Sequence, residues 1–223
     1  VSERLQMQEL QEHWKASVKR LQGSRLRKKG NPLYVLPWFL IMGESRTGKT
    51  SAIKNSRLSS PMTEVSRASG ISGTRNCDWW FFEEAVILDT AGRYTIPIDE
   101  GPDLEEWKQF LTLLAKYRKR EPLNGVIVGI SADKLLSGDE KKLREDAQSI
   151  RRRIDQMMRI MGAKFPVYVL VTKMDLVHGF TDFTHRLPPE SMSQAMGYMN
   201  ADLNPYWQEI AEEGLKKIAE DLK

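Results

Sequence analysis

Short apolar runs alternate with longer amphipathic segments along most of this chain. Runs with the length and composition of buried β-strands fall at 38–42, 74–82, 85–88, 124–130 and 167–171. Only Glu83 and Glu84 separate the second run from the third, which predicts an antiparallel hairpin. The pattern therefore predicts a mostly parallel sheet with one antiparallel edge strand.

Amphipathic helices are predicted where apolar residues recur every three or four positions. Their apolar faces are Leu10, Trp14, Val18 and Leu21; Leu104, Trp107, Phe110, Leu111, Leu114 and Tyr117; Leu143, Ala147, Ile150, Ile154, Met157 and Met161; and Trp207, Ile210, Ala211, Leu215 and Ile218. A further helix is expected from Ser51 to about Leu58. The three arginines at 151–153 are expected on a solvated outer face.

The alternation of strands and helices predicts a three-layer α/β domain, with helices on both faces of the sheet and a helical extension at each end. We expect three regions: an N-terminal helix with a basic linker at 1–30, the α/β domain at 31–200 and a C-terminal helical extension at 201–223. The chain has 223 residues, enough for one such domain with a sizeable core.

Composition excludes several classes of protein. Hydrophobic residues make up 40% of the chain and aromatic residues 9%, which is typical of a globular domain and not of a disordered one. The single cysteine, Cys77, excludes an internal disulfide and fits a reducing compartment. No apolar run reaches 18 residues, so no bilayer-spanning segment is expected. The chain begins at Val1 rather than Met, which indicates a piece of a longer protein.

The formal net charge of +4 is unevenly distributed. The linker at 23–32 carries Arg25, Arg27, Lys28 and Lys29 and no acidic residue. Three interpretations are open: a solvated linker, a cytoplasmic segment next to a membrane, or a surface for nucleic acid. We expect no nucleic-acid partner.

The strongest chemical signal is the pattern G-x-x-x-x-G-K-T at 43–50, directly after the first predicted strand. This is the sequence and the context of a P-loop. Backbone N–H groups of such a loop point at the β-phosphate of a nucleotide. Lys49 would reach the β- and γ-phosphate oxygens, and the Thr50 hydroxyl would ligate Mg²⁺. The sequence thus predicts nucleotide binding.

Two further motifs follow predicted strands. Asp89 opens the pattern D-T-A-G, which ends at Gly92, and is expected to hold Mg²⁺ as a Walker-B aspartate does. The pattern T-K-x-D at 172–175 resembles the guanine-specificity motif of GTPases. In that motif the aspartate, here Asp175, accepts hydrogen bonds that adenine cannot donate, and the stem of Lys173 covers the base. No S-A-K motif follows Asp175 to complete the base contacts.

Several of these segments together resemble the IcmF/TssM family. They are L-P-W at 36–38, the P-loop, T-R-N-C-D-W-W-F at 74–81, D-T-A-G-R-Y-T at 89–95, P-L-N-G-V at 122–126 and T-K-M-D at 172–175. The similarity spans about residues 31–200, and T-R-N-C-D-W-W is more specific than the P-loop.

The resemblance implies a place in the cell and a set of partners. Members of this family are inner-membrane components of bacterial type VI secretion systems, with relatives in type IV systems. They carry a small-GTPase-like P-loop NTPase domain on the cytoplasmic face of the inner membrane. This chain would be that domain, in a membrane-anchored parent protein, and its partners would be a TssL-like inner-membrane protein and components of the baseplate.

The resemblance also implies site residues. The phosphate cradle would consist of Gly43, Glu44, Ser45, Arg46, Thr47, Gly48, Lys49, Thr50 and Ser51, with Gly92 beside it. Mg²⁺ would be held by Thr50 and Asp89, and the base would be bound by Thr172, Lys173 and Asp175. Thr74 is the candidate for the switch threonine that completes Mg²⁺ coordination, and Thr63 is the alternative.

One position departs from Ras-like GTPases. After D-T-A-G they carry a glutamine that orients the attacking water, whereas this chain has Arg93. An arginine in that place could neutralise charge on the transferring phosphoryl group, an effect of about 10³ to 10⁵ in rate when it is well placed. We therefore group Arg93 with Lys49 and Thr74 as candidate catalytic residues, and we expect slow or partner-stimulated hydrolysis.

The leading hypothesis is a Mg²⁺-dependent GTPase-like switch whose nucleotide state changes the loops at 59–73 and 91–101. Two alternatives stay open. One is a P-loop scaffold with little or no turnover, favoured by Arg93 and by the missing S-A-K motif. The other is an ATPase, which would share the phosphate site and differ at the base.

Overall fold

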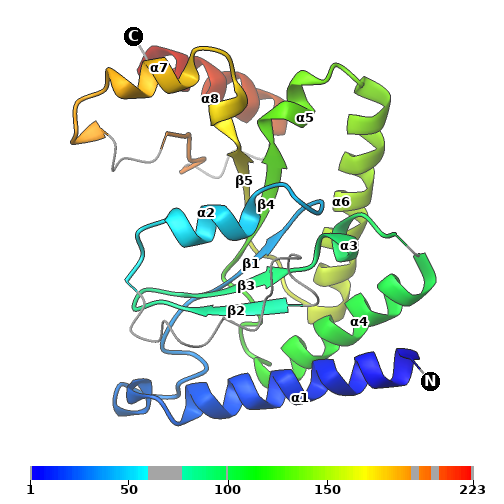
Figure 1. The fold of residues 1–223 in the computed structure, drawn as a ribbon. Helices are drawn as coiled ribbons and strands as arrows, with labels where there is room; N and C mark the ends of the chain where they lie inside the picture. The colour runs from blue at the N-terminus through cyan, green and yellow to red at the C-terminus, as the bar shows by residue number, and fades with distance from the viewer. Residues whose placement is uncertain (1, 60–76, 99, 192–195, 202–205, 222–223) are drawn as a thin grey trace. The chain divides into compact units, whose positions relative to one another are not determined.

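The computed structural model describes residues 2–59, 77–98, 100–191, 196–201 and 206–221 (Figure 1). The chain divides into two compact units, Val1–Val177 and His178–Lys223. The first unit contains the sheet and all the predicted motifs, and the second contains two helices among its described residues, α7 (Phe180–His185) and α8 (Trp207–Asp221). No helix in the described ranges combines the length and the hydrophobicity that crossing a bilayer requires.

The first unit is built on a five-stranded sheet with the order β2-β3-β1-β4-β5. The strands are β1 (Trp38–Met42), β2 (Cys77–Phe81), β3 (Val86–Thr90), β4 (Gly125–Ser131) and β5 (Val167–Thr172). All neighbours pair in parallel except β2 and β3, which form the antiparallel hairpin that the two-residue connection predicts. The predicted sheet is confirmed, although 74–76 of the second predicted strand lie outside the described residues.

Helices cover both faces of this sheet, as predicted (Figure 1). The helical segments of the unit are α1 (Ser2–Gln22), η1 (Arg25–Lys28), α2 (Lys49–Asn55), α3 (Gly92–Thr95), α4 (Glu100–Tyr117), α5 (Ala132–Leu136), α6 (Glu140–Met161) and η2 (Met174–Leu176). On one face, α1, α4 and α6 enclose the larger core. On the other face, Ile53 of α2 packs with Ile41 and Ile87 in a smaller one. The three-layer α/β fold class is thus confirmed.

Helix α2 differs from the predicted range of 51–58, because it begins at Lys49 and ends at Asn55. Gly48 precedes it in the left-handed conformation, with φ of 86°. A glycine adopts that conformation without the steric cost that a side chain would impose. The turn at Gly48 thereby starts the helix inside the motif, so that Lys49 and Thr50 belong to its first turn.

Helix α1 is part of the larger core. Its predicted apolar face, Leu10, Trp14, Val18 and Leu21, is at most 3% exposed. The ring of Trp14 lies 4.8 Å from that of Trp79 on β2 and 5.2 Å from that of Phe110 on α4, both edge to face. Because aromatic pairs of this geometry add to the free energy of burial, α1 is fixed to both the sheet and α4.

The L-P-W and P-L-N-G-V segments meet at the start of β1. The Asn124 side-chain oxygen accepts the backbone N–H of Trp38 at 2.8 Å and a bond from Arg118 at 3.3 Å. The Arg118 guanidinium is fully buried and lies 4.5 Å from the Trp38 ring centroid and 5.1 Å from that of Tyr34. These contacts give L-P-W and P-L-N-G-V a structural role, because they fix the start of β1 against the start of β4.

The predicted outer face of α6 is wrong for one of its three arginines. Arg151 is exposed, but Arg153 is only 6% exposed. Residue 153 is three positions after Ile150 and four before Met157, so the helical repeat turns it toward the core. Burial, and to a lesser extent Arg152, lower the pKa of Arg153, while Glu100 and Asp103 act in the opposite direction.

In the second unit, the residues predicted to share one face of α8 do not form a buried stripe. Trp207 is 72% exposed and Leu215 is 70% exposed. Gly214 of α8 packs against Tyr198, because a Cβ added to Gly214 would lie 2.9 Å from the Tyr198 ring. A substitution there would require the ring to move.

The packing of α1 leads to a stability prediction. Replacing Trp14 with alanine (Trp14→Ala) leaves a cavity among Trp79, Phe110 and Tyr117, and should lower the free energy of unfolding by about 3–5 kcal/mol. The exposed neighbour Lys15 provides a matched control, since Lys15→Ala should change it by less than about 0.5 kcal/mol. Urea titrations followed by far-UV circular dichroism measure both. Equal midpoints for Trp14→Ala and the unmodified chain would contradict the assignment of α1 to the core.

Candidate functional site

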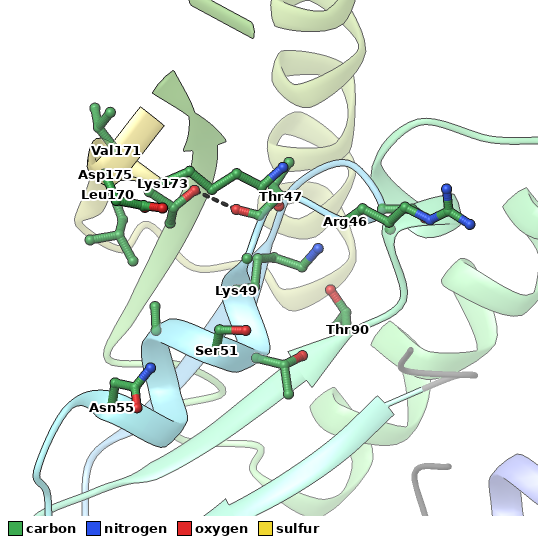
Figure 2. Close-up of a pocket in the computed structure, with 16 residues that line it drawn as sticks. Arg46, Thr47, Lys49, Ser51, Asn55, Thr90, Leu170, Val171, Lys173 and Asp175 are labelled. Carbon is green, nitrogen blue, oxygen red and sulfur yellow. Dashed lines mark hydrogen bonds between the residues drawn. The ribbon is translucent and has the colours of Figure 1, made fainter. Parts of the chain in front are cut away.

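A cavity of about 870 Å³ lies at the carboxyl ends of the parallel strands (Figure 2), where open α/β sheets bind ligands. Three separate segments line it: the loop after β1 with the first turns of α2, the end of β3, and the end of β5 with the turn that follows. Predicted nucleotide-binding residues in the lining are Ser45, Arg46, Thr47, Gly48, Lys49, Thr50, Ser51, Gly92, Thr172, Lys173 and Asp175. Gly43 and Glu44 lie at the base of the loop, outside this lining.

Lys49 is 6% exposed at the first position of α2. Its ammonium group donates to the carbonyl oxygens of Gly43 and Glu44, each at 2.9 Å. Burial lowers the pKa of Lys49, while the nearby carboxylates of Asp89 and Glu44 act in the opposite direction. The loop therefore folds around a buried cation whose remaining hydrogen-bonding capacity is available to an anion.

Close backbone packing at two glycines fixes the loop. A Cβ on Gly43 would lie 2.3 Å from the carbonyl oxygen of Gly129 on β4. A Cβ on Gly92 would lie 2.1 Å from the backbone nitrogen of Ser45. Any side chain at either position would force the backbone apart, so the D-T-A-G segment is in direct contact with the loop.

Thr50 and Asp89 meet at the cavity although they are far apart in the sequence. The Thr50 hydroxyl donates to the Asp89 carboxylate at 2.5 Å, and Asp89 is fully buried. A hydroxyl and a carboxylate are the hard oxygen ligands that Mg²⁺ prefers, with nucleotide phosphates and water supplying the other positions. In the described ranges no group of three or more His, Cys, Asp or Glu side chains could hold a metal by itself. The donors fit a cation that binds together with a phosphate.

The T-K-x-D segment lines the opposite end of the cavity from Arg46 (Figure 2). The Thr172 hydroxyl donates to the Thr47 carbonyl and so joins β5 to the loop. Lys173 has a left-handed backbone with φ of 55°, and its Cγ would lie 3.7 Å from a Cβ placed on Gly48. Asp175 follows in η2. The stem of Lys173 thus runs over the loop beside Asp175.

Arg93 does not line the cavity. Its guanidinium pairs with Asp103 at 2.7 Å and with Glu106 at 2.5 Å, both buried carboxylates of α4. The Tyr94 hydroxyl donates to Glu106 at 2.9 Å and extends the same cluster. The guanidinium is therefore paired with α4 and is not part of the cavity lining, so this geometry gives no support to a catalytic role for Arg93.

The predicted switch residues cannot be placed. Thr74 and the alternative Thr63 both lie outside the described residues. The assignment of Thr74 to catalysis and to Mg²⁺ coordination therefore stays a prediction.

The structure adds residues that the sequence did not single out. The Thr95 hydroxyl accepts the backbone N–H of Gly43 at 3.0 Å, and the Thr95 carbonyl accepts the Ser149 hydroxyl at 2.9 Å. On the other side of the loop, Lys134 of α5 pairs with Glu44 and with Asp146 of α6. The R-Y-T extension of D-T-A-G contains Thr95, but no motif in the sequence marks Ser149, Lys134 or Asp146.

The sequence-family model of the IcmF-related N-terminal domain matches residues 100–222 of this chain. The type VI secretion system component TssM1 of Pseudomonas aeruginosa (strain PAO1) is 45% identical over 169 residues, which is 74% of this chain and 15% of that protein. The chain thus spans less than one sixth of its relative's length.

The solved structures that are similar to this chain are distant from it in sequence and have low TM-scores. A probable GTP-binding protein engB is 14% identical, with a TM-score of 0.39 over 83% of this chain and 97% of the other. The G-domain of FeoB from Methanococcus jannaschii is 12% identical, with a TM-score of 0.25 over 67% of this chain and 93% of the other. The fold assignment therefore rests on the sheet order and on the loop between β1 and α2.

Because the family model covers more than half of the chain and a TssM1 protein is similar over most of it, the chain belongs to the IcmF/TssM family.

Proposed function

We propose that this chain is a Mg²⁺-dependent guanine-nucleotide switch domain. One observation carries the proposal: residues from three separate segments of the chain converge on one cavity. Asp175 and Lys173 lie at one end, the buried Lys49 begins α2, and Thr50 with Asp89 lies beside it. A fold without a nucleotide site would not be expected to bring these groups together.

The charges of the cavity suit a polyphosphate. Lys49 and Lys173 line it along with Asp175, and the first turn of α2 borders the same space. The fit of Thr50 and Asp89 to a hard cation supports Mg²⁺ as the cofactor. When bound, Mg²⁺ would supply positive charge to the phosphate oxygens.

The base preference follows from Asp175. A carboxylate in that position accepts hydrogen bonds from the N1–H and the 2-amino group of guanine, and adenine would leave it unpaired. This favours GTP over ATP as the nucleotide.

The reaction would be in-line attack of water on the γ-phosphorus, with GDP as the leaving group. Lys49 would hold the β- and γ-phosphate oxygens throughout. No glutamine follows D-T-A-G, so we expect turnover to be slow, or to be stimulated by a partner protein.

The cellular role is inferred from the relative named TssM1. We propose that the domain works on the cytoplasmic face of the bacterial inner membrane, in a membrane-anchored component of a type VI secretion system. Its nucleotide state would change contacts with a TssL-like inner-membrane protein and with baseplate components. The exposed cations of the 25–29 segment would suit a position near an anionic membrane.

The first functional prediction concerns phosphate binding. Lys49→Ala removes the buried ammonium group and should weaken Mg²⁺-GTP binding by at least about 100-fold, because contacts between charged groups contribute about 1.5–3 kcal/mol each. Lys54→Ala, an exposed position on the same helix, should bind like the unmodified chain. Titration with a fluorescent GTP analogue measures all three affinities. A chain that binds no nucleotide before mutation would reject the proposal in favour of a scaffold.

The second prediction concerns base recognition. The unmodified chain should bind GTP at least about tenfold more tightly than ATP. Asp175→Asn should weaken GTP binding by about 10- to 100-fold, because a hydrogen bond to a charged acceptor is lost. The same variant should gain affinity for xanthosine triphosphate, whose 2-oxo group accepts a bond from the asparagine amide. Asp155→Asn, on the outer part of α6, should change none of these affinities; ATP binding equal to GTP binding before mutation would indicate an ATPase instead.

A further inference from the structure

Arg46 occupies an unusual backbone conformation in the phosphate loop. Its φ is 65°, in the left-handed region that favours glycine, and a side chain there costs about 1–2 kcal/mol. Strain of this kind persists where the surrounding structure holds it, and it is concentrated at functional sites. Here the loop places a long cationic side chain on the lining of the nucleotide cavity.

The other cations near the cavity each have a polar or charged partner within the protein. Lys49 donates to two loop carbonyls, and Lys173 lies 3.8 Å from Asp133. Arg93 is held by two carboxylates of α4. Arg46, by contrast, is exposed and its guanidinium has no ion pair or hydrogen bond with any described residue. Its long side chain is therefore free to turn toward a bound anion.

The position of Arg46 indicates which phosphate it would reach. Lys173 and Asp175 mark the base end of the cavity, and Figure 2 draws the Arg46 guanidinium on the opposite side of Lys49, beyond Thr90. A nucleotide with its base at Asp175 and its β-phosphate at Lys49 has its γ-phosphate at that far side. Gly92, which contacts Ser45, borders the same end.

We propose that Arg46 is a catalytic residue that supplies, from within the loop itself, the positive charge expected at Arg93. This inference rests on the proposed nucleotide binding. Water oxygen bonds to the γ-phosphorus as the bond from that phosphorus to the β,γ-bridging oxygen breaks. The electron pair leaves with GDP, and the water proton passes to the phosphate product or to solvent. The Arg46 guanidinium donates to the γ-phosphoryl oxygens as negative charge moves toward the leaving group.

The rate of hydrolysis tests the proposal. An arginine supplied by the same chain supports turnover of about 10⁻² s⁻¹, whereas GTPases without one turn over at about 3–5 × 10⁻⁴ s⁻¹. We expect the unmodified chain to hydrolyse GTP near the first value and Arg46→Ala to lose at least about 20-fold in kcat. Affinities for GTP and GDP should change less than about threefold, because the contact forms as the phosphoryl group transfers.

A transition-state analogue gives a second, independent readout. GDP with aluminium fluoride should bind to the unmodified chain and not to Arg46→Ala, while GDP alone binds to both. Arg46→Lys should recover only part of the loss, since an ammonium group lacks the planar fork of the guanidinium. Arg57→Ala is the matched control, because Arg57 is also exposed with a left-handed φ of 58° but does not line the cavity.

The outcomes separate the two proposals. If the unmodified chain binds no nucleotide, both fail. If it binds GTP in a Lys49-dependent way but hydrolyses it no faster than about 5 × 10⁻⁴ s⁻¹, only the assignment of Arg46 fails. That assignment is also overturned if Arg46→Ala keeps its kcat, whatever its affinities for GTP and GDP.

Discussion

The parallel pairing of β1 with both β3 and β4 is the constraint on which the site depends. The register places Ile41 beside Asp89 and Met42 beside Val128. Strands that run in the same direction end at the same edge of the sheet, so the loop after β1 emerges between the ends of its neighbours. Backbone contacts of Gly43 with Gly129 and of Gly92 with Ser45 then leave the loop little freedom. The arrangement of Lys49, Thr50 and Asp89 is a consequence of that register.

A buried charge cluster between α3 and α4 supports the loop that follows β1. Arg93 and Tyr94 join α3 to Asp103 and Glu106 of α4, and Thr95 joins α3 to Gly43 and to Ser149 of α6. Removing one partner from such a cluster leaves an uncompensated buried charge, which is strongly destabilising. The D-T-A-G-R-Y-T segment is thus attached to the loop and to two helices. The helix α4 that pairs with Arg93 also packs Phe110 against Trp14 of α1.

These contacts change the roles that the sequence suggests for two arginines, Arg93 and Arg46. In the sequence, Arg93 occupies the position of a catalytic glutamine and Arg46 is an ordinary variable residue of the P-loop pattern. In the structure, Arg93 is an internal connection between α3 and α4, whereas Arg46 is the exposed cation on the cavity lining. The difference arises because Asp103 and Glu106 are buried about one helical turn apart on α4 and both pair with the Arg93 guanidinium.

The sequence by itself determined the strands, the antiparallel hairpin, the apolar face of α1 and the segments that form the cavity. These features depend on local periodicity and on motifs whose residues are adjacent in the chain, and such signals are complete within a short window. Only the tertiary structure decided that Arg153 is buried, that Arg93 faces α4, that Thr95 supports Gly43 and that Lys134 joins Glu44 to Asp146. Each of these depends on a partner from another element, and a side chain's partner is set by how the elements pack.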